Sequence, residues 1–314
     1  MINRVLLRIK IVQILYSFYK GGNHSLSLAE KELLFSIEKT YDLYFHLLQL
    51  SIEITRYADL RIDAGRNKLV PTKEDLHPNT RFVENKFIRQ LEANKQLKDY
   101  FSKRKLSWVN YQDIIKSMYE KIIASGFYSE YMNADTTTYE ADKSIWRKIY
   151  KKIILSDKEL EESLEEQSIY WFDDIELVVS FIIKTIKHFE SEKEDNQALM
   201  PKFRGEQDWE FAKELLTQTI SRSDEYQELI SRFTKNWDYD RIAFMDILIL
   251  KIALAEIINF PTIPINVSLN EYIEIAKFYS TEKSANFVNG ILDNIVNFLK
   301  SENKLTKVVM FNSK

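Results

Sequence analysis

Apolar residues recur along most of the chain at the spacing of amphipathic or buried α-helices, beginning with residues 1–20. This stretch is apolar on most sides, which is typical of a central buried helix, although Arg4, Arg8 and Lys10 interrupt it. Gly21-Gly22-Asn23 follows, and glycine commonly ends a helix. An unusually long second helix is predicted from about Ser27 to Arg56. Its apolar markers are Leu33, Ile37, Leu43, Leu47, Leu50 and Ile54.

The middle of the chain alternates polar and helical stretches. Residues 57–80 are polar and contain Gly65, Pro71 and Pro78, which predicts a loop. Further helices are predicted over Tyr111–Ile123, Lys143–Leu155 and Ile175–Phe189. The polar stretch Glu190–Gln207 follows, and we place a domain boundary in it, near Pro201 and Gly205.

The last third has the clearest helical pattern. Helices are predicted over Asp208–Ser221, Asp224–Thr234, Asp238–Asn259, Ser268–Tyr279 and Glu282–Leu299. Ser268 and Glu271 form a Ser-x-x-Glu pattern, which predicts a capping box at the start of the fourth of these helices. Thr281 is the predicted N-cap of the final helix. We find no internal repeat and predict no strand, so the fold class is all-α.

The amino-acid composition supports long helices connected by few turns. Only 6 Gly and 5 Pro stand among 314 residues, too few for the many tight turns of sandwiches, barrels and Gly-rich nucleotide folds. The chain has no Cys, which excludes thiolate metal sites and cysteine nucleophiles. The formal net charge is −3, so any nucleic-acid site must be a local patch. No apolar stretch is long enough for a membrane span, and we expect a cytoplasmic protein.

The residues that carry catalysis in known motifs are not arranged for it here. The four histidines have no paired ligand spacing, and there is no phosphate loop, Gly-x-Gly-x-x-Gly turn or nucleophile elbow. We therefore expect no catalytic site, no metal and no cofactor.

The surface of the final helix is more informative. At 100° per residue, Phe287, Val288, Ile291 and Leu292 share the core face, whereas Lys283, Asn286, Gly290, Asp293 and Asn297 cluster opposite. A glycine in an exposed helix centre costs about 1 kcal/mol relative to alanine, so Gly290 calls for an explanation. Two explanations stay open: tight packing of a neighbouring helix, or close approach of a ribose–phosphate backbone beside Asn286 and Asn289.

Several separated blocks resemble the NusB transcription antitermination family. They are Asn270–Lys277, Thr281–Ser284 and Phe287–Asp293, with Asp240–Ala243, Asp246 and Ile249–Ile257 upstream and Val12-Gln13 and Leu15–Ser17 in the first helix. The resemblance covers about residues 1–20 and 208–300. It implies two small helical bundles packed through the first helix, and a non-catalytic adaptor that binds boxA RNA of ribosomal RNA leaders together with the ribosomal protein NusE. The pair would act in an RNA polymerase antitermination complex.

We interpret residues 1–20 as the first helix of the NusB-like core and residues 21–200 as a long helical insert. Residues 201–300 are then the C-terminal bundle, and 301–314 a tail. The predicted RNA-binding residues are Arg4, Arg8, Lys10, Lys283, Asn286, Asn289 and Gly290. Val5 and Leu6 lie among the first basic residues, where relatives are richer in arginine. This departure motivates the alternative of a protein–protein scaffold with little RNA binding.

The predicted partner contacts are Asp246 and Tyr16. Asp246 is a lone acid in an apolar helical run, so it is either paired inside or faces a partner, and the resemblance places it toward NusE. For Tyr16 we favour a buried position over a contact with a partner.

The insert contains two oppositely charged segments. Residues 81–105 hold eight basic and three acidic residues, a net charge of +5, whereas residues 156–176 hold nine acidic and one basic, a net charge of −8. We favour mutual attraction of the two segments over a role of the basic one in RNA binding. Apolar burial should hold the insert together through Trp108, Tyr111, Ile115, Trp146, Ile149 and Ile153, and we expect residues 75–200 to be removable.

Overall fold

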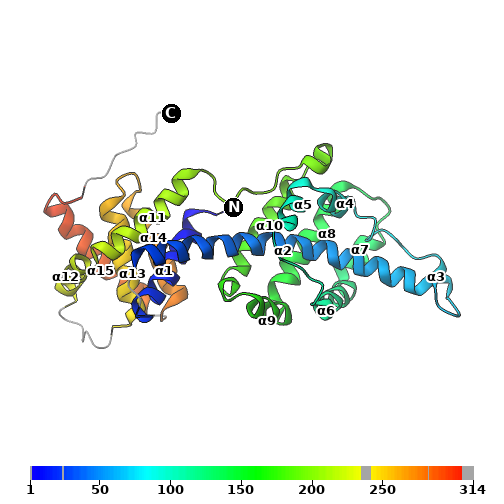
Figure 1. Cartoon of the computed structure of the whole chain (residues 1–314), viewed down its shortest axis with the longest axis horizontal. Coiled ribbons are helices and arrows are strands. Elements are labelled where there is room, and N and C mark those ends of the chain that lie inside the picture. The colour runs from blue at the N-terminus through cyan, green and yellow to red at the C-terminus, as the bar shows by residue number, and fades with distance from the viewer. Residues whose placement is uncertain (1, 23–24, 235–241, 282, 306–314) are drawn as a thin grey trace. The chain divides into compact units, whose positions relative to one another are not determined.

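The computed structural model describes residues 2–22, 25–234, 242–281 and 283–305, and within these ranges the regular structure is helical (Figure 1). The all-α prediction is confirmed. Contacts divide the chain into two compact units. Unit 1 is Glu38–Lys202, and unit 2 combines Ile2–Ile37 with the chain from Phe203 onward. The division after Lys202 falls between Pro201 and Gly205, whereas the other division falls within the second helix.

Unit 2 is built from α1 (Arg4–Lys20), the start of α2 (Leu26–Arg66), α11 (Glu206–Ser221), α12 (Ser223–Phe233), α13 (Phe244–Asn259), α14 (Ile265–Tyr279) and α15 (Ser284–Ser301). The central helix is α13, which contacts α1, α11, α12, α14 and α15. It is buried on nearly every side because its sequence is apolar all round. A single bridge between Ile2 and Phe203 lies beside the start of α1.

Three helix starts in unit 2 differ from the sequence prediction. α14 begins at Ile265, directly after Pro264, because proline has a backbone suited to the position before a helix. Ser268 therefore lies inside the helix, and the predicted capping box is wrong. The N-cap of α15 is Lys283 rather than Thr281. α13 begins at Phe244, and positions 238–241 and 282 of the predicted helices lie outside the described residues.

Unit 1 contains the remainder of α2 and a set of shorter helices around it. These are α3 (Lys73–Leu76), α4 (Lys86–Ala93), α5 (Lys95–Ser102), α6 (Gln112–Ile123), α7 (Gly126–Met132), α8 (Tyr139–Lys152), α9 (Lys158–Gln167) and α10 (Ile175–His188), with 3-10 turns at Ile154–Ser156, Ile169–Trp171 and Ser191–Asn196. Hydrogen bonds join buried residues of α2 to α8 and α10: Tyr150 OH lies 2.6 Å from Ser51 Oγ, and Tyr44 OH lies 2.7 Å from Thr185 Oγ1.

α2 continues to Arg66, ten residues beyond the predicted end. The prediction was wrong because four charged residues interrupt 57–66, yet Ala58 is still buried, and Ala, Leu and Arg are good helix formers. Gly65 lies within this extension, with the Asp75 carboxylate beside it. The loop predicted over 57–80 is therefore partly helical.

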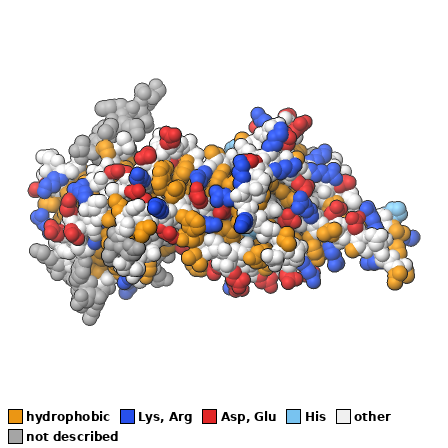
Figure 2. All heavy atoms as spheres, in the orientation of Figure 1, with side chains coloured by type: hydrophobic (Ala, Val, Ile, Leu, Met, Phe, Trp, Pro, Cys, Tyr) orange, Lys and Arg blue, Asp and Glu red, His pale blue; other side chains and the backbone are white. Residues whose placement is uncertain are grey.

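Apolar burial holds unit 1 together as expected, whereas the predicted attraction of the charged segments is wrong. Trp108, Ile115, Trp146, Ile149 and Ile153 are buried, and Tyr111 is half-buried. No described ion pair joins residues 81–105 to residues 156–176; instead Lys121 of α6 pairs with Asp157 at 2.6 Å and with Glu159 at 2.7 Å. In the view of Figure 2 the acidic side chains of α9 gather at one edge, whereas Lys and Arg side chains lie over α4 and α5.

Candidate nucleic-acid interface

The first helix of unit 2 places Arg8 inside the protein. Its Nε donates to Glu256 Oε2 at 2.7 Å and its Nη2 donates to Glu256 Oε1 at 2.8 Å. Arg8 is only 2% exposed, and Glu256 is fully buried. Since the guanidinium is enclosed by protein, Arg8 is not positioned to contact RNA phosphate as the sequence predicted.

The carboxylate of Glu256 also accepts two hydroxyl hydrogen bonds. Ser268 Oγ donates to Oε1 at 2.7 Å, and Tyr272 OH donates to Oε2 at 2.9 Å. Burial alone lowers the pKa of Arg8, but the hydrogen bonds and charge of Glu256 outweigh it and raise that pKa. Burial, together with the charge of Glu256, raises the pKa of Tyr272 well above 10. The four donors satisfy the Glu256 carboxylate, and the buried ion pair joins α1, α13 and α14.

Two further predicted residues also lie inside. Lys10 is 1% exposed, so its ammonium is not presented at the surface. Asp246 is 5% exposed, and its carboxylate accepts hydrogen bonds from Ser280 Oγ at 2.6 Å and Ser284 Oγ at 2.9 Å. The sequence left two possibilities for Asp246, a partner inside the protein or a contact with another protein. The structure shows the partner inside. Asp246 ties the start of α13 to the junction of α14 and α15.

Arg4 lies near the opposite end of α13. Its side chain is half-buried, with the guanidinium carbon 4.8 Å from the centre of the Phe211 ring on α11. Arg8 contacts Glu256 near the end of α13, whereas Tyr16 contacts Phe244 at its start, so α1 and α13 run antiparallel. Arg4 therefore lies beyond the Glu256 end of this helix pair.

The surface of α15 lies at the other end of α13. Lys283, Asn286 and Gly290 are exposed, and Asn289 is half-buried. Ser284 joins this helix start to Asp246, which is ten positions from Glu256, or about 15 Å along α13. The structure therefore groups the predicted residues of α15 but separates them from Arg4. We call Lys283, Asn286, Asn289 and Gly290 the α15 face.

Gly290 has open space around it. An added Cβ would meet no described atom within 4 Å. One of the two explanations for this glycine was tight packing of a neighbouring helix. No described residue packs closely enough against Gly290 to support that explanation.

An aromatic and basic cluster that the sequence analysis did not identify lies where α1 ends and α13 begins. Tyr16 is 43% exposed, contrary to the buried position that we favoured, and its ring meets that of Phe244 edge-on at 5.7 Å. Phe244 is 37% exposed, and Lys20 Nζ lies 4.4 Å from the centre of its ring. The signal in the sequence is the run Tyr16, Phe18 and Tyr19, which is followed by Lys20. We call Tyr16, Lys20 and Phe244 the aromatic cluster.

Beside this cluster, Ser223 accepts hydrogen bonds from two side chains. Lys251 Nζ and Tyr19 OH each lie 3.0 Å from Ser223 Oγ. Burial lowers the pKa of Lys251, and burial also raises the pKa of Tyr19. Both residues are therefore partly withdrawn from solvent and support the surface formed by their exposed neighbours.

The described residues include no group of three or more His, Asp or Glu side chains that could hold a metal ion. None of the described helices has the length and apolar character needed to cross a membrane.

The comparisons with known proteins concern mainly the C-terminal part of the chain. The NusB family model matches residues 176–297. Over 91 residues the chain is 38% identical to the transcription antitermination protein NusB of Natranaerobius thermophilus, covering 29% of this chain and 66% of the relative. Over 105 residues it is 39% identical to that of Bacillus licheniformis, covering 33% of this chain and 81% of the relative. The match to the protein of Salinibacter ruber is 40% identical over 98 residues and covers 61% of that relative.

A solved structure of T. maritima NusB is 28% identical, covers 44% of this chain and 84% of that one, and has a TM-score of 0.29. The family assignment depends on the sequence matches, which cover four fifths of the Bacillus protein at 39% identity. The chain therefore belongs to the NusB family, whose members in these sequence comparisons are transcription antitermination proteins.

Proposed function

We propose that this protein is a transcription antitermination factor that binds boxA RNA together with NusE, without catalysis. Membership of the NusB family supports the antitermination role. The RNA and the protein partner are the ones that the resemblance of its C-terminal motifs implies. In this proposal the protein serves as an adaptor for an RNA polymerase antitermination complex.

The observation that carries RNA binding is the open surface at Gly290. A glycine at an exposed helix position lowers helix stability, and no described neighbour needs the space that it leaves. A ligand whose backbone approaches the helix closely would use that space. The glycine lies on the same exposed face as Lys283 and Asn286, which supply a cation and an amide.

The chemistry of the α15 face suits single-stranded RNA. Lys283 offers an ammonium for phosphate, and the side-chain amides of Asn286 and Asn289 offer both donors and acceptors for base edges. α15 has no side-chain cap and no acidic residue in its first turn, so its N-terminal backbone N–H groups and positive dipole end also favour phosphate.

We assign the aromatic cluster to NusE. Exposed aromatic rings that keep one face in contact with protein are typical anchors of protein interfaces. Tyr16 and Phe244 meet this description, since each is more than one third exposed while their rings touch. Asp246 lies beneath the surface and would support this region rather than contact the partner.

The alternative of a scaffold with little RNA binding has an observation in its favour. Two of the four basic residues in the first helix, Arg8 and Lys10, are buried, which leaves Arg4 half-buried and Lys20 in the aromatic cluster. Fewer phosphate contacts would mean weaker and less salt-dependent RNA binding.

Fluorescence anisotropy with labelled boxA RNA, with and without NusE, distinguishes the two functions. The test variant is Lys283→Ala/Asn286→Ala. The matched control is Asn297→Ala/Lys300→Ala, which removes the same side-chain types from exposed positions near the other end of α15. We expect the test variant to bind RNA at least ten-fold more weakly and the control to bind normally. The slope of the logarithm of RNA affinity against the logarithm of salt concentration should become smaller by about 0.7, because one phosphate contact is lost.

NusE binding by the wild-type chain without any RNA binding would establish the scaffold alternative. Equal RNA affinities of the test and control variants would contradict the assignment to the α15 face. For the protein partner, Tyr16→Ala/Phe244→Ala should weaken NusE binding measured by calorimetry, and an unchanged affinity would remove the aromatic cluster from the interface.

A further inference from the structure

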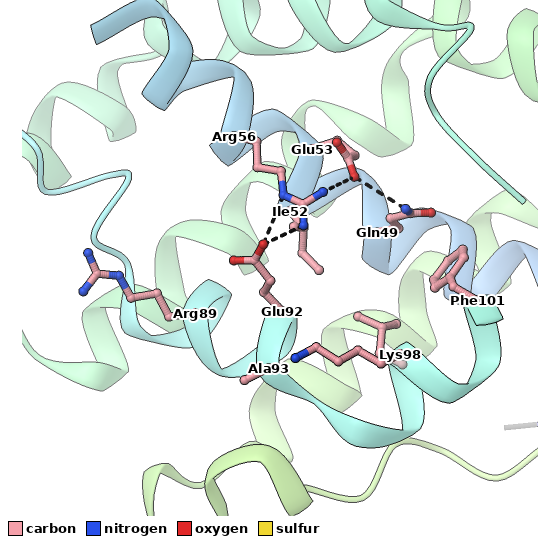
Figure 3. Close-up of a pocket in the computed structure, with 10 residues that line it drawn as sticks. Gln49, Ile52, Glu53, Arg56, Arg89, Glu92, Ala93, Lys98 and Phe101 are labelled. Atoms are coloured by element: carbon pink, nitrogen blue, oxygen red, sulfur yellow. Dashed lines mark hydrogen bonds and ion pairs between the residues drawn. The ribbon is translucent and has the colours of Figure 1, made fainter. Parts of the chain in front are cut away.

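Unit 1 contains a pocket of about 490 Å³ between α2, α4 and α5, far along the chain from the α15 face (Figure 3). Its size lies within the range of small-ligand sites. Helix α2 contributes Ile52, Glu53 and Arg56, α4 contributes Arg89 and Glu92, and α5 contributes Lys98 and Phe101. The pocket therefore combines apolar, acidic and basic groups.

One part of the pocket lining is apolar. Ile52 and Leu97 are buried, and Ala93 and Phe101 are half-buried. A flat aromatic ligand can pack on such a surface, and stacking on an aromatic side chain is a usual means of holding a nucleobase.

A carboxylate on the wall offers a hydrogen-bond acceptor. Arg56 Nε and Nη2 both donate to Glu92 Oε1, at 3.1 and 2.6 Å, and Arg56 Nη1 donates to Glu53 Oε1 at 2.9 Å (Figure 3). Because both bonds to Glu92 use the same oxygen, Oε2 remains to accept from a ligand. Carboxylates accept hydrogen bonds from the exocyclic amino groups of bases.

Two cations border the pocket from different helices. Arg89 and Lys98 are both exposed. The carboxylate nearest to Arg89 is that of Glu84, at 4.0 Å, and the side chain of Lys98 makes no hydrogen bond or ion pair with the described residues. These cations are available for phosphate groups.

We propose that this pocket binds one nucleotide of single-stranded RNA, with the base against Phe101 and Glu92 and the phosphates at Arg89 and Lys98. A nucleotide presents amino N–H donors and phosphate oxygens, which match both signs of charge in the pocket. An acidic peptide would match the cations but would bring carboxylates against Glu53 and Glu92. The inference rests on the proposed RNA-binding function, to which it adds a second contact that reads RNA outside boxA.

The test uses the full chain and two labelled RNAs: boxA alone, and boxA extended by flanking single-stranded nucleotides. Arg89→Ala/Lys98→Ala should bind the extended RNA about ten-fold more weakly, with a log–log salt slope lower by about 1.4, and should bind boxA alone normally. The matched control is Lys116→Ala/Lys151→Ala, which removes two exposed cations of unit 1 outside the pocket. It should bind both RNAs like the wild type.

A second variant tests the hollow itself. Ala93→Phe fills the pocket without changing its charge, so it should weaken binding of the extended RNA while leaving the salt slope unchanged. Ultraviolet crosslinking of the extended RNA, followed by peptide mass spectrometry, should mark the peptide that contains Phe101. Far-ultraviolet circular dichroism of each variant establishes that it remains folded.

The outcomes separate this inference from the proposed function. If Arg89→Ala/Lys98→Ala binds the extended RNA like its control, the pocket is not an RNA site. An acidic protein segment would then be the ligand that matches its cations. If Lys283→Ala/Asn286→Ala has no effect but the pocket variants do, the pocket assignment stands and the α15 face is wrong. Failure of the wild type to bind either RNA would overturn both.

Discussion

Arg8 and Glu256, which are 248 positions apart in the sequence, form a two-bonded ion pair inside unit 2. Each residue is a charge within an apolar helical stretch, and the pairing joins the first helix to the central helix. Ser268 and Tyr272 complete the hydrogen bonding of the carboxylate. A residue that looks like a phosphate contact in the sequence thus has a structural role.

The ion pair predicts a large stability effect. Arg8→Ala leaves the Glu256 carboxylate buried without its cation, which should lower the free energy of unfolding by about 3–5 kcal/mol. Urea denaturation measures this loss. Arg4→Ala is the control, because Arg4 is only half-buried and should contribute far less. Equal losses in the two variants would mean that the ion pair is not what holds the first helix.

Gly290→Ala should change stability and RNA binding in opposite directions. Alanine favours a helix over glycine by about 1 kcal/mol, and the added Cβ meets no described atom, so the melting temperature should rise. The same methyl group should obstruct close approach of RNA and lower boxA affinity. A stabilised variant with unchanged RNA affinity would show that the backbone at Gly290 is not approached by RNA.

Asp246→Asn should destabilise unit 2 by about 1–3 kcal/mol, because one of the two serine hydroxyls that donate to this carboxylate loses its acceptor. Asp246→Lys should be worse, since it places an unpaired cation beside the start of α15. Thermal melts give the stabilities, and NusE titrations of the folded Asn variant test the partner assignment. A strong loss of NusE affinity without a loss of stability would show that Asp246 contacts NusE after all.

His46 predicts a pH dependence of stability. Burial lowers the pKa of His46 from 6.5 to about 4, although the hydrogen bond with Gln167 opposes this shift. The ring is stacked on Trp108, with centroids 4.2 Å apart. Between these two pKa values the unfolded chain binds the proton and the folded protein does not. Stability should therefore fall as pH drops from about 6.5 to about 4, by up to about 3 kcal/mol.

Urea titrations across this pH range check the effect. His46→Phe keeps an aromatic ring in place and should remove this part of the pH dependence, whereas His188→Phe, at an exposed position, should keep it. The same slope in wild type and His46→Phe would assign the pH dependence to other groups.

The course of α2 changes the expectation for truncation. Deleting residues 75–200, as the sequence favoured, would leave Leu43, Leu47, Leu50 and Ile54 of α2 without their buried surroundings. We expect that product to aggregate. Replacing Glu38–Lys202 with a flexible linker removes unit 1 as a whole and should leave a helical, monodisperse unit 2, measured by circular dichroism and size-exclusion chromatography. A soluble, folded 75–200 deletion would contradict this reasoning.

Much of the helical content followed from periodicity alone. The ends of helices α6, α10, α11 and α12 lie within two residues of their predicted bounds, because their apolar residues repeat with the helical period and their ends carry clear polar breaks. The extension of α2 was missed. Ala58, which is buried, and Ile62 continue the apolar spacing from Ile54, but the charged residues between them and the glycine and prolines that follow hid this weak pattern.

The exposed face of α15 could also be derived from the sequence, since residues on one helix share a fixed angular relation whatever surrounds them. Lys283, Asn286 and Gly290 are exposed, and Val288, Leu292 and Ile295 are buried. The positions of Lys10 and Tyr16 could not be derived this way. α1 is contacted on several sides, and its amphipathic signal is weak.

The sequence by itself therefore determined the all-α class, most of the helices and the outward face of α15, because these depend on spacing within one segment. Only the tertiary structure decided that Arg8 pairs with Glu256, that Asp246 holds Ser280 and Ser284, and that Gly290 has open space around it. The physical reason is that the fate of a charge in an apolar helix depends on what another, distant segment places against it. Burial without a partner is too costly to persist, but the identity of the partner is not encoded in local periodicity.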